Sequence, residues 1–302
     1  MKPKNRKHIG HRMKLHLRVR TLGKKVFRII SLRPDTQVRF STNFYHGTHH
    51  ILCAPVGAKL LAHIMWGLSY QKKPDTFFLI HGEHLQSNPF DAAPSKPIIL
   101  APGNLTYLKK AHFVALRKEL KRLGPSDKTI RWQSHGLVRK FEEAPEDEHL
   151  GTNYYSGWTR GVRSECEKSS YEDLHKQEYV VARHGVLYYA APPELLRIHA
   201  SYLYHGFDFS SVHPNYPYEY MYLAESKVGG SNWYPPGEIQ VFPSYEQRCS
   251  AAREVRREIL GERTSLSEDE ILDIQVGTEK RFVLRLQQRI KNSKSKVIDG
   301  MS

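Results

Sequence analysis

The clearest pattern in the sequence is an alternation of apolar and polar side chains close to the N-terminus. Residues 13–20 read Met-Lys-Leu-His-Leu-Arg-Val-Arg. In an extended strand this order places apolar side chains on one face and basic ones on the other. Residues 21–25 contain Gly23 and predict a turn into a second strand over residues 26–32. The pattern indicates a folded basic hairpin, with a cleaved targeting leader as the alternative for so acid-poor a segment.

Helical and buried-strand patterns follow in the next hundred residues. A helix is expected over residues 57–68, where the apolar stripe is Leu60, Leu61, Ile64, Met65 and Leu68. Gly67 stands near its end, as a helix stop would. Continuous apolar runs predict strands over residues 76–80 and 97–100, and a weaker run predicts one over 129–133. Asn104 can cap a helix that runs to about Leu123, before Gly124-Pro125.

The second half of the chain repeats the mixture of strands and helices. Residues 179–190 read as strand, turn and strand, and Pro192-Pro193 opens a helix to about residue 204. Residues 206–242 are rich in Pro, Gly and Tyr and carry little helical signal, while helices are expected over 244–260 and 268–291. This order predicts an α+β fold, with a doubly wound α/β sheet over residues 50–135 as the alternative. The predicted segments are a basic arm (1–33), a central domain (34–205) and a C-terminal appendage (206–302).

Charge is concentrated in the predicted basic hairpin. The chain of 302 residues has a formal net charge of +15, and residues 1–33 hold twelve Lys or Arg and no acidic residue. Such a block attracts polyanions, so a nucleic acid or a nucleoprotein is the expected partner. The residues expected to contact it are Arg12, Lys14, Arg18, Arg20, Lys24 and Lys25.

Cysteine usage and hydropathy limit the class of protein. The three cysteines, Cys53, Cys166 and Cys249, are scattered and lack CxxC spacing. This favours a reducing, intracellular and cytoplasmic setting over a disulfide framework or a zinc knuckle. No run of 18 apolar residues occurs, so we expect no membrane span.

The doubly wound alternative would bring several polar residues to strand ends. They are Cys53, His81, Glu83, His84, Asn104 and His135, with Gly57 and Gly103 at helix starts where an anion could bind. Neither GxGxxG nor GxxxxGK[ST] is present. The dense histidine groups, residues 46–50 and 81–84, do not match HExxH and would fall at opposite ends of a parallel sheet, so no metal is expected.

A second candidate site comes from three short motifs in order along the chain. Tyr45-His46-Gly47-Thr48 comes first, the apolar helix ending at Gly67-Leu68 follows, and Glu178 opens the run Glu-Tyr-Val-Val. This order resembles the ADP-ribosyltransferase superfamily, and within it the His–Tyr–Glu group of the diphtheria-toxin and poly(ADP-ribose) polymerase type. The resemblance covers residues 38–192 and implies the mixed β-sheet core of that superfamily.

The resemblance also implies a substrate and residue roles. NAD would bind with His46 on the adenosine-side ribose and Gly47 on the nicotinamide carboxamide, next to Tyr45 and Thr48. Glu178 would hold the nicotinamide ribose, and a fixed carboxylate there would stabilise an oxocarbenium-like transition state. ADP-ribose would pass to a macromolecular acceptor, such as a nucleic acid or a protein associated with one.

The nicotinamide-stacking aromatic of this family has no obvious counterpart. The family places a tyrosine on a strand after the histidine, whereas the corresponding run here is Thr-Phe-Phe-Leu-Ile. The candidates are Tyr70, Phe78 and Tyr155. Lys176 stands two residues before Glu178, where arginine-modifying relatives carry Glu or Gln, so arginine is not the favoured acceptor.

Two other functions compete with NAD-dependent transfer. One is a non-catalytic nucleic-acid-binding protein that uses the basic N-terminal arm. The other is an α/β hydrolytic or transfer enzyme built on the loop with His81, Glu83 and His84.

Overall fold

The computed structural model describes residues 10–138, 171–205, 218–224, 235–261, 263 and 265–299. The chain divides into two compact units, residues 1–85 with 96–243 and residues 86–95 with 244–302. This division differs from the predicted segments, because the basic N-terminal residues belong to the larger unit and the boundary falls near residue 243.

The predicted basic hairpin is part of the main sheet. Strands β1 (Met13–Leu22) and β2 (Lys25–Ser31) pair antiparallel around the turn at Gly23. They lie in a seven-stranded sheet of order β7-β1-β2-β5-β6-β9-β8. The remaining strands of this sheet are β5 (Thr76–Ile80), β6 (Ile98–Pro102), β7 (Lys128–Trp132), β8 (Tyr179–Arg183) and β9 (Val186–Ala191).

The sheet is mixed, which supports the α+β class and overturns the doubly wound alternative. Strand β2 runs parallel to β5, and β6 runs parallel to β9. However, β5 and β6 are antiparallel neighbours, whereas a doubly wound sheet would make them parallel. The strand formed by residues 48–53 belongs to a different sheet.

That smaller sheet has the order β10-β11-β4-β3. Its strands are β3 (Phe40–Tyr45), β4 (Thr48–Cys53), β10 (Glu219–Leu223) and β11 (Gly237–Val241). Strands β3 and β4 form a hairpin, and β11 runs parallel to β4. Residues of the Tyr- and Pro-rich stretch thus complete a sheet begun almost 200 residues earlier.

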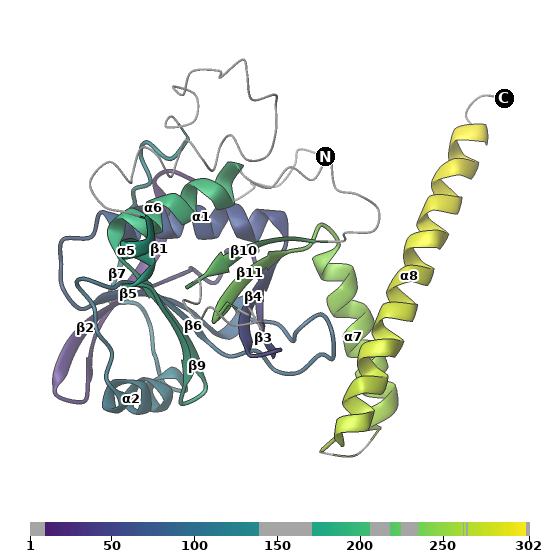
Figure 1. Cartoon of the computed structure of the whole chain (residues 1–302), viewed down its shortest axis with the longest axis horizontal. Helices are drawn as coiled ribbons and strands as arrows, with labels where there is room; N and C mark the ends of the chain where they lie inside the picture. The colour runs from purple at the N-terminus through teal and green to yellow at the C-terminus, as the bar shows by residue number, and fades with distance from the viewer. Residues whose placement is uncertain are drawn as a thin grey trace. The chain divides into compact units, whose positions relative to one another are not determined.

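Helices cover both faces of the main sheet (Figure 1). Helices α1 (Pro55–Ser69) and α6 (Pro193–His205) lie side by side on one face, near the short α5 (Tyr171–His175). Helix α2 (Lys110–Leu120) lies on the other face, between β2 and β9. A short 3-10 helix (Gly82–His84) follows β5.

Two hydrophobic cores result, one on each face of the sheet. Phe78 and Leu100 point into the core under α1 and α6, while Phe77 and Ile99 point into the core under α2. Because β5 and β6 are buried on both faces, their sequences are continuous apolar runs without alternation. Such a run predicts each of these two strands directly from the sequence.

Helix α2 begins later than Asn104, the predicted cap. Residues before it are held beside β5, where the Thr106 hydroxyl accepts from Thr76 N–H at 3.1 Å and donates to Thr76 O at 2.8 Å. The helix then starts after Lys109, whose backbone N–H donates to the His112 ring at 3.1 Å. Tertiary hydrogen bonding at Thr106 therefore prevents an earlier helix start.

The smaller unit contains helices α7 (Tyr245–Leu260) and α8 (Glu268–Asp299). The loop of residues 86–95 belongs to it through Gln86, whose Nε2 lies 3.2 Å from Cys249 Sγ, and through Arg256, which donates to Asp91 O at 2.9 Å. Among the described residues, no helix has both the length and the apolar character that a membrane crossing needs.

Candidate functional site

The His46-Gly47 pair forms a tight turn between β3 and β4. Tyr45 and Thr48 are the closing pair, and His46 and Gly47 have φ of 50° and 81°. Two consecutive residues with positive φ define the type I′ turn that fits the twist of a hairpin, and glycine is favoured at its second position. Residues 183–186 do the same between β8 and β9, with His184 and Gly185 at φ of 51° and 76°. Hairpin geometry therefore accounts for both His-Gly pairs.

The residues on the two sides of the turn differ in exposure to solvent. Tyr45 and His46 are exposed, with their ring centroids 3.8 Å apart. Thr48 is buried, and its hydroxyl donates to Pro235 O at 2.7 Å. Only the tip of the turn is thus open to a ligand.

Glu178 is part of a buried cluster. Its side chain has no exposed surface, Oε2 accepts a hydrogen bond from His175 Nδ1 at 2.6 Å, and Oε1 lies 3.6 Å from His199 Nδ1. Burial lowers the pKa of His199 to about 4, with the Glu178 charge acting in the opposite direction. A ribose hydroxyl could reach the carboxylate only by displacing one of these histidines.

The three candidate stacking aromatics have different environments. Tyr70 follows α1, is 57% exposed, and has the Arg197 guanidinium 5.4 Å from its ring centroid. Phe78 is fully buried in the core near Trp132, so it offers no ring face to nicotinamide. Tyr155 lies outside the described residues. NAD-dependent transfer by His46 and Glu178 therefore stays a prediction.

The residues expected at the ends of a doubly wound sheet do not act as one group of ligands. Cys53 is fully buried, and burial raises the pKa of its thiol, which makes it a poor nucleophile. His84 is buried with Nδ1 3.4 Å from Val38 O, whereas His135 is exposed and packs edge-on against His11. In the described part of the chain, the one group of three residues whose potential ligand atoms lie close enough to share a metal is His175, Glu178 and His199.

Three of the six predicted polyanion contacts are engaged within the fold. Arg18 is buried and donates to Ser31 Oγ at 2.8 Å and to Gly124 O at 3.2 Å. Arg20 and Lys25 form ion pairs with Asp127 and Asp75, at 2.8 Å and 2.6 Å. The other three, Arg12, Lys14 and Lys24, are exposed.

A stronger cationic feature lies at the C-terminal end of α2. A surface hollow there is lined by four cationic side chains, one carboxylate and one histidine from the β8–β9 turn: Arg117, Lys118, Lys121, Arg122, Glu119 and His184. We call this group, together with Arg183 of the same turn, the α2 cationic surface. Arg117 and Lys118 lie in the last turn of the helix and Lys121 and Arg122 directly follow it, and all four are exposed.

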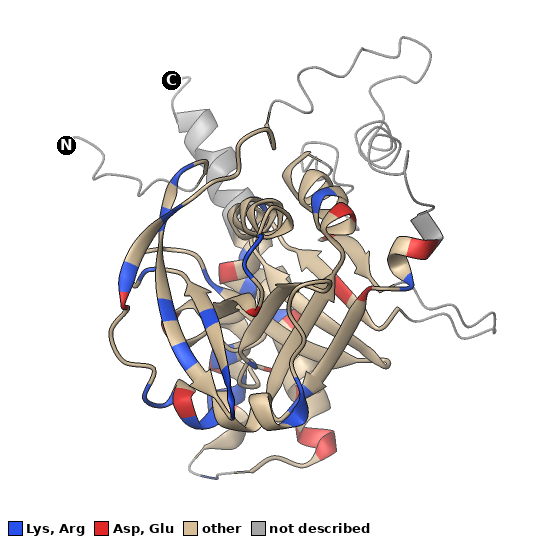
Figure 2. Ribbon diagram, turned by 90° about the vertical axis from the view of Figure 1, so that its left-hand side faces the viewer, with Lys and Arg blue, Asp and Glu red and all other residues tan. Residues whose placement is uncertain are grey.

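The charges of the α2 cationic surface are not neutralised within the fold. Arg117, Lys118, Lys121, Arg122 and Arg183 are exposed, and none of them forms an ion pair with a described acidic residue. Figure 2, which faces the side of the sheet edge and α2, shows Lys and Arg along the strands and on the helix below them. An anion could bind here without breaking an existing pair.

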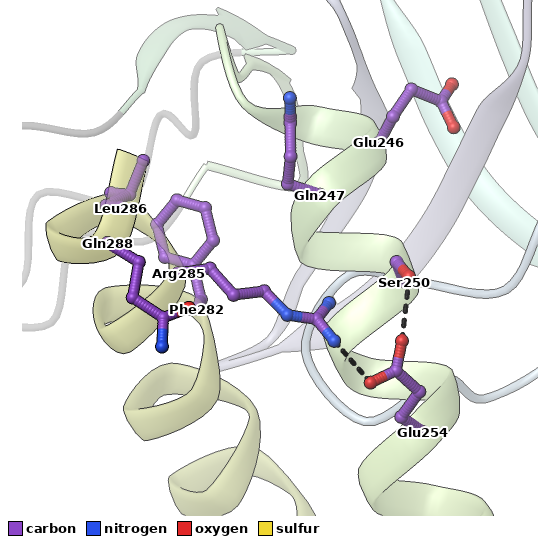
Figure 3. Close-up of a pocket in the computed structure, with 8 residues that line it drawn as sticks. All are labelled: Glu246, Gln247, Ser250, Glu254, Phe282, Arg285, Leu286 and Gln288. Atoms are coloured by element: carbon purple, nitrogen blue, oxygen red, sulfur yellow. Dashed lines mark hydrogen bonds and ion pairs between the residues drawn. The ribbon is translucent and has the colours of Figure 1, made fainter. Parts of the chain in front are cut away.

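In the hollow between α7 and α8, by contrast, the charged side chains are paired (Figure 3). Arg285 points across it and pairs with Glu254, whose other oxygen accepts from Ser250 Oγ at 3.0 Å. Arg281 pairs with Glu258 at 2.7 Å. These charges pair with one another and stabilise the helix pair, so they do not favour a charged ligand in the hollow.

Sequence patterns could have identified the α2 surface but not the buried cluster. The sequence Arg-Lys-Glu-Leu-Lys-Arg shows four cations within six residues, yet the basic N-terminus dominated the charge count. The spacing of His175, Glu178 and His199 does not match HExxH. Comparison with protein-family models, curated proteins and solved structures finds no match to this chain.

Proposed function

We propose that this protein binds nucleic acid through the α2 cationic surface. The observation that supports this most directly is the set of exposed, unneutralised cations Arg117, Lys118, Lys121 and Arg122 around one hollow. Phosphate groups repeat along a nucleic acid at spacings that such a cluster can follow, and binding releases condensed counterions.

The position of this surface favours an extended anion over a single phosphate. Lys24 is exposed at the β1–β2 turn, and this turn lies next to α2, since a Cβ built at Gly23 would be 3.7 Å from the His112 ring. Lys109 and Lys110 are exposed at the start of α2. Cations are therefore present at both ends of the helix, which suits a strand of phosphates.

Part of the N-terminal arm then has a different role from the one predicted, while contacts of Arg12, Lys14 and Lys24 with a polyanion stay a prediction. Arg18, Arg20 and Lys25 stabilise the fold, and Lys24 extends the cationic surface. The proposed binding is independent of base sequence, because cation–phosphate contacts carry no sequence information.

The test is fluorescence anisotropy with labelled oligonucleotides over a salt series. The Lys118→Ala/Lys121→Ala double variant should bind more weakly, and its plot of log K against log salt should be shallower by about 1.8, at about 0.9 per lost phosphate contact on duplex DNA. The matched control is Lys59→Ala/Lys176→Ala, which removes the same charge from α1 and from the end of α5, by the other face of the sheet. An equal loss in both double variants would refute this surface as the binding site.

NAD-dependent ADP-ribose transfer has no further support from the described geometry. It would be tested by nicotinamide release from NAD by the wild type and by Glu178→Ala, with and without nucleic acid. Equal release by both proteins would exclude the proposed role of Glu178.

A further inference from the structure

We propose that His175, Glu178 and His199 form a binding site for a single transition-metal dication, with Zn²⁺ the best match to its donors. The three residues come from the end of α5, the residue before β8 and the middle of α6. One ligand atom from each residue can be chosen so that all three lie within 4.8 Å of one another.

Local backbone structure brings the first two ligands together. The chain turns at the end of α5, where Gln177 N–H donates to Leu174 O at 3.0 Å and Glu178 N–H donates to His175 O at 3.2 Å. This turn puts the side chains of His175 and Glu178 on one side, facing α6. Packing of α6 against α5 then supplies His199.

The distances are close to those of a coordinated ion. Donor atoms about 2.0–2.2 Å from a tetrahedral Zn²⁺ lie roughly 3.2–3.6 Å from one another. Glu178 Oε1 and His199 Nδ1 are 3.6 Å apart. The shorter 2.6 Å separation of His175 Nδ1 and Glu178 Oε2 holds a proton between them. A metal ion bound to Nδ1 would take the place of that proton, which the neutral imidazole can carry on Nε2 instead.

A bound cation would compensate the buried charge of the Glu178 carboxylate. No surface of the Glu178 side chain is exposed, and Oε1 is buried without a hydrogen-bond partner in the described part of the chain. No described Lys or Arg pairs with this carboxylate. A buried carboxylate oxygen without a partner is costly, and a bound cation would compensate it.

The chemical types of the donor atoms indicate which metal ion fits the site best. Two imidazoles and one carboxylate suit Zn²⁺, whereas Mg²⁺ and Ca²⁺ prefer sets made of oxygen ligands. The Tyr189 hydroxyl lies 2.8 Å from His199 Nδ1 and offers a fourth donor from β9. With all four residues buried, the ion would have a structural role and tie α5, α6 and β9 together.

The experiment is metal titration of the full-length protein after removal of metal with a chelator. The wild type should bind one equivalent of Zn²⁺ and gain thermal stability, and Co²⁺ in its place should give the intense visible bands of a tetrahedral site. Glu178→Gln and His199→Gln should weaken Zn²⁺ binding by more than the roughly 10- to 100-fold that loss of an outer hydrogen-bond partner gives.

A matched control separates this site from the other histidines of the chain. His63→Gln removes another buried histidine, one that hydrogen-bonds Ser134 at 2.6 Å, and should keep the Zn²⁺ equivalent. The proposal would be overturned if the wild type showed no tetrahedral Co²⁺ spectrum, or if folded Glu178→Gln bound Zn²⁺ as the wild type does. The Co²⁺ spectrum of the wild type decides the matter even if a variant fails to fold.

Discussion

At the scale of single residues, Gly67 has a structural role that the sequence did not suggest. It lies in the last turn of α1, two residues before the helix ends, and a Cβ built there would be 2.4 Å from the indole of Trp132. The Trp132 Nε1 donates to His63 O, on the same helix, at 2.9 Å. Gly67→Ala should therefore destabilise the fold by about 1–3 kcal/mol through overpacking, despite the better helix propensity of alanine. Urea unfolding gives this value.

A double-mutant cycle shows whether Trp132 is the cause. In the background of Trp132→Leu, the same Gly67→Ala change should cost much less, because the smaller side chain can shift. Equal costs in both backgrounds would assign the effect to something other than the close approach of the indole.

His50 should make stability depend on pH. Burial is the main cause that lowers the pKa of His50 to about 4, and the neighbouring His49 adds to it. An unfolded histidine binds its proton near pH 6.5, so stability falls as the pH drops from 6.5 towards 4, by up to about 1.4 kcal/mol per pH unit. His50→Gln should flatten the dependence of unfolding free energy on pH in this window.

The opposing group has to be removed for a clean measurement. Glu238 faces His50 at 3.9 Å, and burial raises the pKa of its carboxyl, so its contribution decreases as the pH rises past its unfolded pKa near 4.5. The comparison is therefore made in a Glu238→Gln background. An unchanged pH dependence there would show that His50 has the same pKa in the folded and unfolded states.

At the scale of helices and strands, local patterns predicted the elements but not their partners. The apolar runs of β5 and β6 and the stripe of α1 gave nearly correct boundaries, because burial on one or two faces determines which residues occur there. The pairing of strands, in contrast, is not determined by local patterns. Nothing in the alternation of residues 13–20 shows that β1 will lie between β2 and β7, since register and neighbours depend on distant segments.

The two candidate sites differ in the same way, because one follows from a local sequence pattern and the other from tertiary packing. The cations at the C-terminal end of α2 stand close together in the sequence and can be recognised from that segment alone. The cluster of His175, Glu178 and His199 depends on how α6 packs against the end of α5. The order of His46 and Glu178 along the chain suggested a common site, yet one residue forms an exposed turn and the other is buried.

The contact between α7 and α8 should depend mainly on Arg248. Its side chain is 5% exposed, it pairs with Glu279 through two hydrogen bonds of 2.9 and 3.2 Å, and its guanidinium lies 4.2 Å from the Phe282 ring centroid. Arg248→Met should destabilise the helix pair by about 1–3 kcal/mol, from the lost charge-assisted hydrogen bonds and the cation–π contact. Chemical denaturation followed by circular dichroism measures it.

Arg281 is the matched control on the same helix pair. It forms a similar two-point pair with Glu258, but the Arg281 side chain is 31% exposed, against 5% for Arg248. Arg281→Met should cost less than about 1 kcal/mol, because exposed ion pairs contribute little. Equal losses for the two arginines would show that burial does not distinguish them.

At the scale of the whole molecule, folding and nucleic-acid binding should both belong to the larger unit. Every described residue of the two hydrophobic cores of the main sheet lies between Met13 and Val241. The α2 cationic surface lies in the same unit. Residues 244–302 contain twelve Lys or Arg and ten Asp or Glu, so removing them lowers the net charge only from +15 to +13.

A chain ending at Pro243 should therefore remain folded and bind nucleic acid with an unchanged salt dependence. The loop of residues 86–95 would lose its contacts with Cys249 and Arg256, so local exposure should increase there without loss of the sheet. Hydrogen exchange measures the local exposure of residues 86–95, and anisotropy titrations measure the salt dependence of binding. A folded truncated chain that no longer bound oligonucleotides would place essential contacts on α7 or α8. The α2 cationic surface would then be insufficient for binding, and the proposed function would have to be revised.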